Sequence, residues 1–363
     1  MVCELEPAAE WRAADVADPE RWTLRLEAAD HEELDAALRA ARAVGGDPLA
    51  IRREDFPLEA LATKLSDAVT TLLDGRGFVR ISALDVDRYS DDDLSLLYWG
   101  IGLHLGEPWP QNKHGHVLGD VTDQGKSYDD PTARGNELGA IALDYHTDGS
   151  DLVGLLCLRT ARRGGLSCVA NAVAIHNALV RERPDLAALL YEPLPYDLRG
   201  EEKDGTRPFF TIPAFTEHHG RLFVRFIPPY IYASQRHADA PRLSDDAKEA
   251  ITAAIQLAND PDFNVYMDLQ PGEMQFINNY HVLHGRTAYE DDPASGHKRH
   301  LKRLWLATHR LTDRPLLFQA RGVAHWAERR SVSHVAAVDR PSASRAGSPA
   351  TRSFLRNSDA PTT

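Results

Sequence analysis

The sequence predicts an α+β protein in which short antiparallel strands form the core and helices support them from outside. Short apolar runs bounded by Gly, Pro, Asn or Asp gather around two histidine-containing segments, near residues 146 and 284. Helical periodicity is concentrated near the start of the chain and in one later insertion. Strands gathered in this way, with helices segregated from them, are typical of an antiparallel sheet structure with helical supports.

The composition excludes several kinds of partner. A formal net charge of -13 over 363 residues disfavours binding to nucleic acid phosphates, and no apolar run is long enough to cross a bilayer. Cys3, Cys157 and Cys168 are odd in number and widely spaced, so they predict neither disulfides nor a structural zinc site. We expect a cytoplasmic protein that acts on a small molecule, with no nucleic acid or membrane partner; homo-oligomer formation stays open.

The chain divides into three parts by composition. Residues 1–50 form a lead-in with one short helix around His31–Val44. Residues 51–320 contain the strands and the candidate chemistry. Residues 321–363 shift towards Arg, Ser, Ala and Pro, which predicts a mostly disordered tail.

The elements before residue 140 alternate between helix and strand. Apolar residues at three- and four-residue steps predict a core-facing helix over Leu58–Leu73, which ends near Gly75. A buried strand over 77–82 and a helix over Asp91–Leu103 follow. Lys113–Asn136 is rich in Gly, Asp and His, which indicates a long polar loop, either a lid or a solvated connection.

The later elements are mainly strands. Arg221–Phe226 alternates with a period of two, which predicts a strand with one polar face. The other expected strands cover 153–158, 168–170, 265–269, 273–278 and 300–309, and the expected helices cover 172–183 and 245–258.

A candidate metal site follows the apolar run that begins at Ile141. His146 and Asp148 are two positions apart, so both side chains project from one face of an extended backbone. The segment Asn278–Arg286 offers a third ligand in His284. Two His and one carboxylate on one side of an ion form the facial triad of non-haem Fe(II) oxygenases.

The sequence offers other candidate ligands. His237–Asp239 repeats the His-x-Asp pattern, but it lies in a polar stretch interrupted by Pro and is interpreted as a surface loop. His281 is a rival third ligand. His284 itself has an alternative role as a core or loop histidine.

Two arginines point to an anionic ligand near the metal. Arg299 and Arg303 are four residues apart and share a face if they lie in a strand. They would otherwise form a solvated cationic edge. The apolar continuation Leu304–Ala307 favours burial, and a buried guanidinium requires an anion.

Together these motifs resemble the TauD/TfdA family of Fe(II)- and 2-oxoglutarate-dependent dioxygenases. The resemblance covers about Gly77 to Thr308 and implies a double-stranded β-helix, a cupin-like jelly roll, as the core with flanking helices. It rests on an ordered set of segments: His146–Asp148, Gly164–Ser167, Asn279 with His284–Arg286, and Arg299–Arg303.

The resemblance implies a role for each matched residue. His146, Asp148 and His284 match the iron ligands, and the match of Asn279 to a family Asn favours His284 over His281. The implied cofactors are Fe(II), 2-oxoglutarate as co-substrate, and O2. The implied reaction is hydroxylation of an unactivated C–H bond with release of succinate and CO2, although desaturation and demethylation stay open.

The co-substrate residues are implied in the same way. Ser167 and Arg299 match positions that bind the distal carboxylate of 2-oxoglutarate, and Arg303 matches an arginine that faces the substrate or the near carboxylate. An Asp at position 148, in place of the small residue of related halogenases, favours hydroxylation over chlorination. The chain has no evident equivalent of the family's sulfonate-binding histidine, so taurine is not expected.

The expected substrate is a small anionic compound, such as an amino acid or another carboxylic acid. Candidate substrate residues are Gln111, Asn112, Tyr145 and Arg225, together with Arg303. An alternative function is a cupin-like metal-dependent hydrolase or isomerase, which would leave Arg299 and Ser167 without a role. A β-sandwich binding module with incidental histidines is a third possibility.

Overall fold

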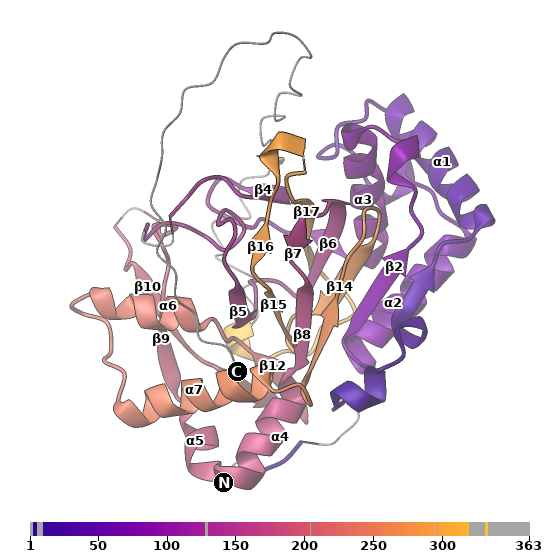
Figure 1. Ribbon diagram of the computed structural model, residues 1–363. Helices are drawn as coiled ribbons and strands as arrows, with labels where there is room; N and C mark the ends of the chain where they lie inside the picture. Colours follow the sequence, from indigo (N-terminus) through magenta and orange to yellow (C-terminus); the bar gives the residue numbers. More distant parts are fainter. Residues whose placement is uncertain are drawn as a thin grey trace, which may run out of the picture.

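Two β-sheets face one another, and helices cover their outer surfaces (Figure 1). The structure is a computed structural model that describes residues 3–5, 10–127, 130–203, 205–295, 297–318 and 331–332. This arrangement is a double-stranded β-helix with flanking helices, so the predicted α+β fold class is confirmed.

The larger sheet carries the arginine-bearing strand near its centre. Its order is β1–β2–β14–β6–β17–β4–β18, with β3 also beside β17. Apart from the parallel pairs β1–β2 and β4–β18, neighbouring strands are antiparallel. The strands are β1 (Thr23–Arg25), β2 (Phe78–Ser82), β3 (Glu107–Pro108), β4 (His116–Val121), β6 (Leu152–Arg159), β14 (Met274–Asn278), β17 (His300–Ala307) and β18 (Ser331–Val332).

The smaller sheet carries the candidate metal ligands. Its order is β13–β8–β15–β5, antiparallel throughout. Its strands are β5 (Leu143–His146), β8 (Ser167–Asn171), β13 (Asn264–Met267) and β15 (Val282–Arg286). Three two-stranded ribbons complete the β-structure: β7 (Arg163–Gly164) with β16 (Tyr289–Glu290), β9 (Pro193–Asp197) with β10 (Phe209–Pro213), and β11 (Phe215–His218) with β12 (Arg221–Val224).

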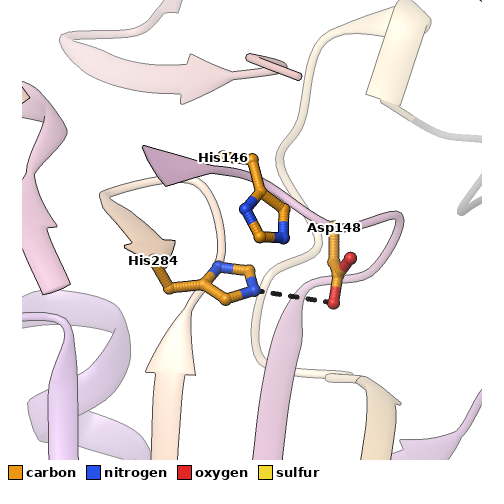
Figure 2. Close-up of side chains that lie close together, drawn as sticks. All are labelled: His146, Asp148 and His284. Atoms are coloured by element: carbon orange, nitrogen blue, oxygen red, sulfur yellow. Dashed lines mark ion pairs between the residues drawn. The ribbon is translucent and has the colours of Figure 1, made fainter. Parts of the chain in front are cut away.

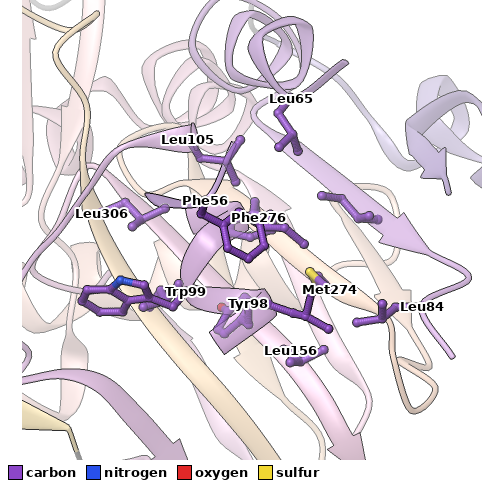
Figure 3. Packing of buried hydrophobic residues seen from close by; sticks show 14 of the residues in the cluster. Phe56, Leu65, Leu84, Tyr98, Trp99, Leu105, Leu156, Met274, Phe276 and Leu306 are labelled. Carbon is purple, nitrogen blue, oxygen red and sulfur yellow. The ribbon is translucent and has the colours of Figure 1, made fainter. Parts of the chain in front are cut away.

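Three helices pack on the outer face of the larger sheet (Figures 1 and 3). They are α1 (Ala28–Ala43), α2 (Ala60–Asp74) and α3 (Asp91–Leu105). The predicted spacing in α2 places Leu61, Leu65 and Leu72 in the core with no exposed surface, and Gly75 is the C-cap. Burial of each such leucine stabilises the fold by about 1.5–3 kcal/mol.

The smaller sheet is covered on its outer face by α4 (Ala172–Glu182), α5 (Pro184–Leu189) and α7 (Asp245–Asn259), which lie on the opposite side of the molecule from α1–α3 (Figure 1). Asn171 and Ser244 cap α4 and α7 through their side chains. The remaining helix, α6 (Pro228–Ala233), follows β12.

The space between the sheets contains a third apolar cluster and the site. Along β17 the side chains alternate: Leu304 packs with α1–α3, whereas Leu301 and Trp305 pack between the sheets. Arg303 shares the inner parity with Leu301 and Trp305. In β15, Val282 likewise belongs to the inner cluster and Leu283 to the outer one, which places His284 on the inner face.

Two predictions about local structure are wrong. The predicted polar loop Lys113–Asn136 contains the buried strand β4, because its one buried acid, Asp120, is neutralised by Lys302, with the ammonium 2.7 Å from the carboxylate. The predicted polar face of Arg221–Phe226 is solvated at Arg221, whose side chain is 37% exposed, but not at Arg225, which is 9% exposed. Pattern alone does not reveal that these polar side chains are buried.

The predicted domain boundaries stay predictions. Residues on both sides of residue 50 pack into one core, since Leu34 and Leu38 of α1 contact the same cluster as α2 and α3. The predicted disordered tail, 321–363, lies outside the described residues except for β18. In the described part of the chain, no helix has the length and apolar character needed to span a membrane.

Candidate metal centre and oxygenase site

Three donor side chains converge between the sheets (Figure 2). His146, the last residue of β5, lies directly opposite His284 of β15 in the strand ladder, with ring centroids 4.3 Å apart. Asp148 follows β5 in a loop, and its Oδ2 lies 3.7 Å from His284 Nε2. One donor atom from each residue lies within 4.8 Å of the other two, a spacing that a single metal ion can bridge.

A glycine permits this close approach of the two strands. A Cβ atom at Gly285 would lie 2.7 Å from the carbonyl oxygen of Leu143, in the neighbouring strand. The ladder between β15 and β5 is also irregular at this point, between His284 and Arg286. Position 285 therefore requires glycine if His146 and His284 are to face each other.

The protonation states suit a divalent cation. Burial and the neighbouring His284 lower the pKa of His146 to about 4, so its imidazole is neutral at pH 7. Its Nδ1 lies 2.7 Å from the carbonyl oxygen of Asp144, which leaves Nε2 as the metal-facing donor. Burial raises the pKa of Asp148, but Arg303 and the two histidines outweigh this and hold it well below its ordinary value. Neutral imidazole and ionised carboxylate are the forms that bind metal.

Polar contacts fix the loop that carries Asp148. The side chain of Asn279 accepts a hydrogen bond from Asp148 N (2.7 Å) and donates to the carbonyl oxygens of Asp148 and Ser150 (2.8 Å each). Trp305 Nε1 donates to Asp148 Oδ2 at 2.9 Å, and Arg303 Nη1 lies 3.3 Å from the same oxygen. The carboxylate is thus held in one orientation by β17.

The triad opens into a cavity of about 510 Å³. Ser167, Arg299 and Arg303 line the cavity together with the three candidate ligands. Its outer wall is mainly apolar, with Phe210 and Ile212 of β10 and Leu317 among the lining residues. A volume of this size accommodates a small organic molecule beside the metal.

Comparison with known proteins identifies the family. Residues 41–305 match the family model described as taurine catabolism dioxygenase TauD, TfdA family. The chain belongs to the TauD/TfdA family. The resemblance seen in the sequence is therefore confirmed, and the chain is a non-haem iron, 2-oxoglutarate-dependent oxygenase that uses Fe(II), 2-oxoglutarate and O2.

Individual relatives support the same assignment. FR-33289 synthase of Streptomyces rubellomurinus is 31% identical over 306 residues, which cover 82% of this chain and 88% of that protein. Uridine-5'-phosphate dioxygenase of an Amycolatopsis species is 26% identical over 62% of this chain and 83% of its own length. The structure of an asparagine oxygenase with Fe(II), hydroxyasparagine and succinate shares the fold, with a TM-score of 0.62 at 19% identity over 79% of this chain and 94% of that one.

A cationic corner of the cavity lies beside the TauD/TfdA triad. Ser167 of β8 pairs with Arg286 of β15, and its Oγ donates to Gln275 Oε1 at 2.5 Å. Arg299 is 5% exposed and donates from Nη2 to the carbonyl oxygen of Gly165 (3.2 Å). Arg299 Nη1 and Arg286 Nε and Nη1 have no hydrogen-bond partner among the described residues. A dianionic co-substrate suits this donor set.

A second glycine shapes this corner. Gly165 has a φ of +75°, and a Cβ atom there would lie 2.8 Å from Arg299 Nε. A larger residue would be strained and would displace the guanidinium. Glycine at position 165 of the Gly164–Gly165 turn is therefore required to leave room for Arg299.

The predicted substrate residues fall into two groups. Arg225 and Arg303 line the cavity. Gln111, Asn112 and Tyr145 do not, so their predicted contact with substrate is not supported. The Gln111 side chain supports Arg303, Asn112 Oδ1 accepts hydrogen bonds from the backbone of the following turn, and Tyr145 packs on the outer face of the smaller sheet.

The competing histidines lie away from the triad. His281 is buried in another environment, where burial and Arg221 lower its pKa to about 4. His237 Nε2 contacts Asp197 Oδ2 at 3.0 Å, whereas Asp239 is exposed. Neither residue joins the cluster around His146.

Three residues near the site received no role from the sequence, although two of them, Arg286 and Trp305, lie in segments that it singled out. Trp305 and Arg286 each lie two positions after a recognised residue, Arg303 and His284, so the period of a strand could have identified both. Arg134 lines the cavity from the connection that follows β4. No periodicity in that segment indicates its position.

Proposed function

We propose that this oxygenase hydroxylates an unactivated C–H bond of a small anionic substrate, with conversion of 2-oxoglutarate into succinate and CO2. One observation carries the proposal: a two-histidine, one-carboxylate cluster and a buried, incompletely paired Arg299 line the same cavity. The cytoplasmic location expected from the cysteines, and any homo-oligomer, stay predictions.

His146, Asp148 and His284 are the proposed Fe(II) ligands. Fe(II), with 2-oxoglutarate and O2, supplies the oxidising chemistry, and the protein supplies position and electrostatics. Three protein donors on one side leave the opposite side for co-substrate and O2. Asn279 and Trp305 keep the carboxylate of Asp148 directed at this point through the contacts given above.

Arg299 and Ser167 are the proposed partners of the distal carboxylate of 2-oxoglutarate. The guanidinium is buried and has a free donor, so a carboxylate would satisfy the hydrogen bond that it lacks. Ser167 Oγ, now bonded to Gln275, supplies a second contact from the opposite sheet. A metal-dependent hydrolase that acts through an activated water would have no use for this pair.

The test is an anaerobic titration of the metal-free protein with Fe(II) and then 2-oxoglutarate, followed by visible spectroscopy. We expect a weak metal-to-ligand charge-transfer band in the wild type that disappears in His284→Ala and Arg299→Ala. Arg163→Ala is the matched control, because Arg163 is exposed and its partner Glu290 is also exposed.

Two results would contradict the proposal. Tight Fe(II) binding without a band would favour the hydrolase or isomerase alternative. A band that survives in Arg299→Ala would assign the co-substrate to another cation, for which Arg286 is the first candidate.

A further inference from the structure

Two buried guanidinium groups flank the residue proposed as the carboxylate ligand. Arg303 Nη1 lies 3.3 Å from Asp148 Oδ2, and Arg225 Nη1 donates to the carbonyl oxygen of the same residue. Each arginine is 9% exposed and lines the cavity. The cavity therefore presents two guanidinium groups beside the proposed metal ligands.

The fold holds both guanidinium groups in place. Arg225 follows β12, and the next residue, Phe226, forms two hydrogen bonds with Thr147, between the two ligands of the His-x-Asp motif. Thr147 N donates to Phe226 O at 2.8 Å, and Phe226 N donates to the side-chain Oγ1 of Thr147 at 2.9 Å. Gln111 Oε1 accepts a hydrogen bond from Arg303 Nε at 2.7 Å. These contacts orient both side chains before any ligand binds.

The carboxylates around the cavity do not balance these two charges. Asp197 is engaged by Arg236 and His237, at 2.7 and 3.0 Å. Glu201 lies 3.8 Å from another arginine of the cavity lining, Arg134, and also accepts a hydrogen bond from a backbone amide. Asp144 lines the cavity but is exposed to solvent.

Asp148 is the remaining acid in the cavity lining, and it is proposed to share its charge with iron. Arg225 forms no ion pair with any described carboxylate; its hydrogen bond goes to a neutral carbonyl oxygen. A buried guanidinium without a counterion is costly, because it loses hydration and gains little in return. The site thus retains a surplus of positive charge for a ligand.

We propose that the substrate carries a tetrahedral phosphorus oxyanion, a phosphate monoester or a phosphonate, bound between Arg225 and Arg303, with no ammonium group beside it. This inference rests on the proposed function and specifies its substrate. A carboxylate offers one charge and two oxygens. A phosphorus oxyanion offers up to two charges and three oxygens, which suits two planar guanidinium groups better. An α-ammonium group would find only exposed Asp144 as a possible acidic partner.

The rest of the substrate is uncharged. Beyond the arginines, the cavity wall is formed largely by apolar side chains, including Phe210, Ile212, Ile227 and Leu317. A hydrocarbon, acyl or ring portion suits this wall. Because the two guanidinium groups flank Asp148, a proposed iron ligand, the oxidised carbon is expected within a few bonds of phosphorus.

The test is isothermal titration calorimetry on protein loaded anaerobically with Fe(II) and 2-oxoglutarate. The probes are propyl phosphate, propylphosphonate, propyl sulfate and 4-aminobutyrate. Propyl sulfate has nearly the shape of propyl phosphate but one charge fewer. We expect both phosphorus compounds to bind at least about tenfold more tightly than the sulfate, and 4-aminobutyrate to bind most weakly.

Variants separate charge recognition from structural support. Arg225→Gln should lower the affinity for propyl phosphate by about 30-fold or more and reduce the preference for phosphate over sulfate. Arg225→Lys should retain part of that preference, since it keeps the charge but loses the fork. Arg163→Gln changes an exposed residue paired with exposed Glu290 and should leave propyl phosphate binding unchanged. A melting curve confirms that each variant folds, and the wild-type phosphate-to-sulfate ratio tests the proposal without any variant.

The possible failures are distinguishable. Equal affinity for phosphate and sulfate, or tighter binding of 4-aminobutyrate that depends on Asp144, would overturn the inference while the charge-transfer band left the proposed function intact. Absence of that band would reject the proposed function instead. Repetition on metal-free protein shows whether the guanidinium groups bind the probe, and binding seen only with iron present would count against the inference.

Discussion

Two acids three residues apart, Asp148 and Asp151, have opposite surroundings. Asp151 is fully buried, and its carboxylate accepts hydrogen bonds from both terminal nitrogens of Arg314 (2.6 and 3.0 Å). Tyr280 Oη and Thr308 N complete its shell at 2.8 and 2.9 Å. Each oxygen of Asp151 therefore has two protein donors.

Asp148 is held on one side only. Trp305 and Arg303 both contact its Oδ2, and the residue lines the cavity. No described protein group donates to its Oδ1. The carboxylate is oriented by the protein and yet retains a free coordination direction.

The comparison separates structural acids from reactive ones. A carboxylate with a complete shell stabilises the fold, because any loss leaves buried partners unpaired. A carboxylate with an incomplete shell at a cavity wall can bind an ion or ligand. The charge of the residue is the same in both cases, and the number of protein partners decides its use.

The largest expected effect comes from substitution of Asp148, the acid with an incomplete set of protein partners. Asp148→Ala should abolish turnover and lower Fe(II) affinity by more than the roughly 10- to 100-fold typical of residues that only orient a ligand. The melting temperature of the metal-free protein should fall less than in Asp151→Asn, because the Asp148 carboxylate has two side-chain partners, Trp305 and Arg303, whereas the Asp151 carboxylate accepts four hydrogen bonds. Fe(II) titration and differential scanning calorimetry on the same sample measure both quantities. A large loss of stability with Fe(II) affinity intact would reverse the assignment.

Substitution of Asp151, the acid with a complete set of protein partners, should show the opposite pattern. Asp151→Asn removes the charge that neutralises buried Arg314, which should cost about 3–5 kcal/mol of the free energy of unfolding. Urea denaturation of the metal-free protein measures this cost. Fe(II) affinity of the fraction that remains folded should equal that of the wild type, and a parallel loss of affinity would show that the two acids are coupled.

The rejected ligand His281 should contribute through its protonation alone. Its pKa is about 4 in the folded chain against an ordinary value of 6.5, so its neutral form is favoured by folding. The unfolded chain binds the proton first as pH falls, and stability should drop below about pH 6.5 and level off near pH 4, by at most about 3 kcal/mol. His281→Gln should flatten this part of the stability profile. An unchanged profile would assign the acid sensitivity to other buried histidines.

A smaller effect is expected for the indole that supports Asp148. Trp305→Phe removes the Nε1 donor but preserves most of the packing between the sheets. Fe(II) affinity should fall by about 10- to 100-fold, as is typical when a partner that orients a metal ligand is lost. Arg163→Ala again serves as the control. Unchanged affinity would show that Arg303 alone orients the carboxylate.

The smallest effect is expected at the second His-x-Asp motif. Asp239→Ala changes an exposed residue away from the cavity, so stability should remain within about 0.5 kcal/mol of the wild type. Fe(II) binding should not change. This variant is the sequence-matched control for Asp148→Ala, and a loss of metal in both would undermine the choice between the two motifs.

Much of the fold followed from local patterns. The helix at Ala60–Asp74, its glycine cap and the acidic start of Asp91–Leu105 agree with the spacing and capping that the sequence predicts. The strand β4 was missed because Asp120 and Gly119 interrupt its apolar pattern. The compensation of Asp120 by Lys302 comes from a strand about 180 residues away.

For the site, the sequence by itself determined which residues share a face. The two-residue step from His146 to Asp148 and the four-residue step from Arg299 to Arg303 predicted that each pair points to one side of the chain, and all four residues line the cavity, although Asp148 follows β5 in a loop and Arg299 precedes β17. The family resemblance then favoured His284 over His281 as the third ligand. These relations join positions close together in the sequence or follow a recognised motif order, so no knowledge of packing was needed.

Only the tertiary structure decided what each polar group meets. It showed that Gln111 supports Arg303 and that Arg225 is buried beside the proposed ligands. It also showed that the carboxylate of Asp151 has a full set of protein donors, whereas that of Asp148 does not. The physical reason is that pairing and desolvation depend on groups brought together across the fold. Periodicity fixes the direction of a side chain, and packing of the two sheets fixes its partner.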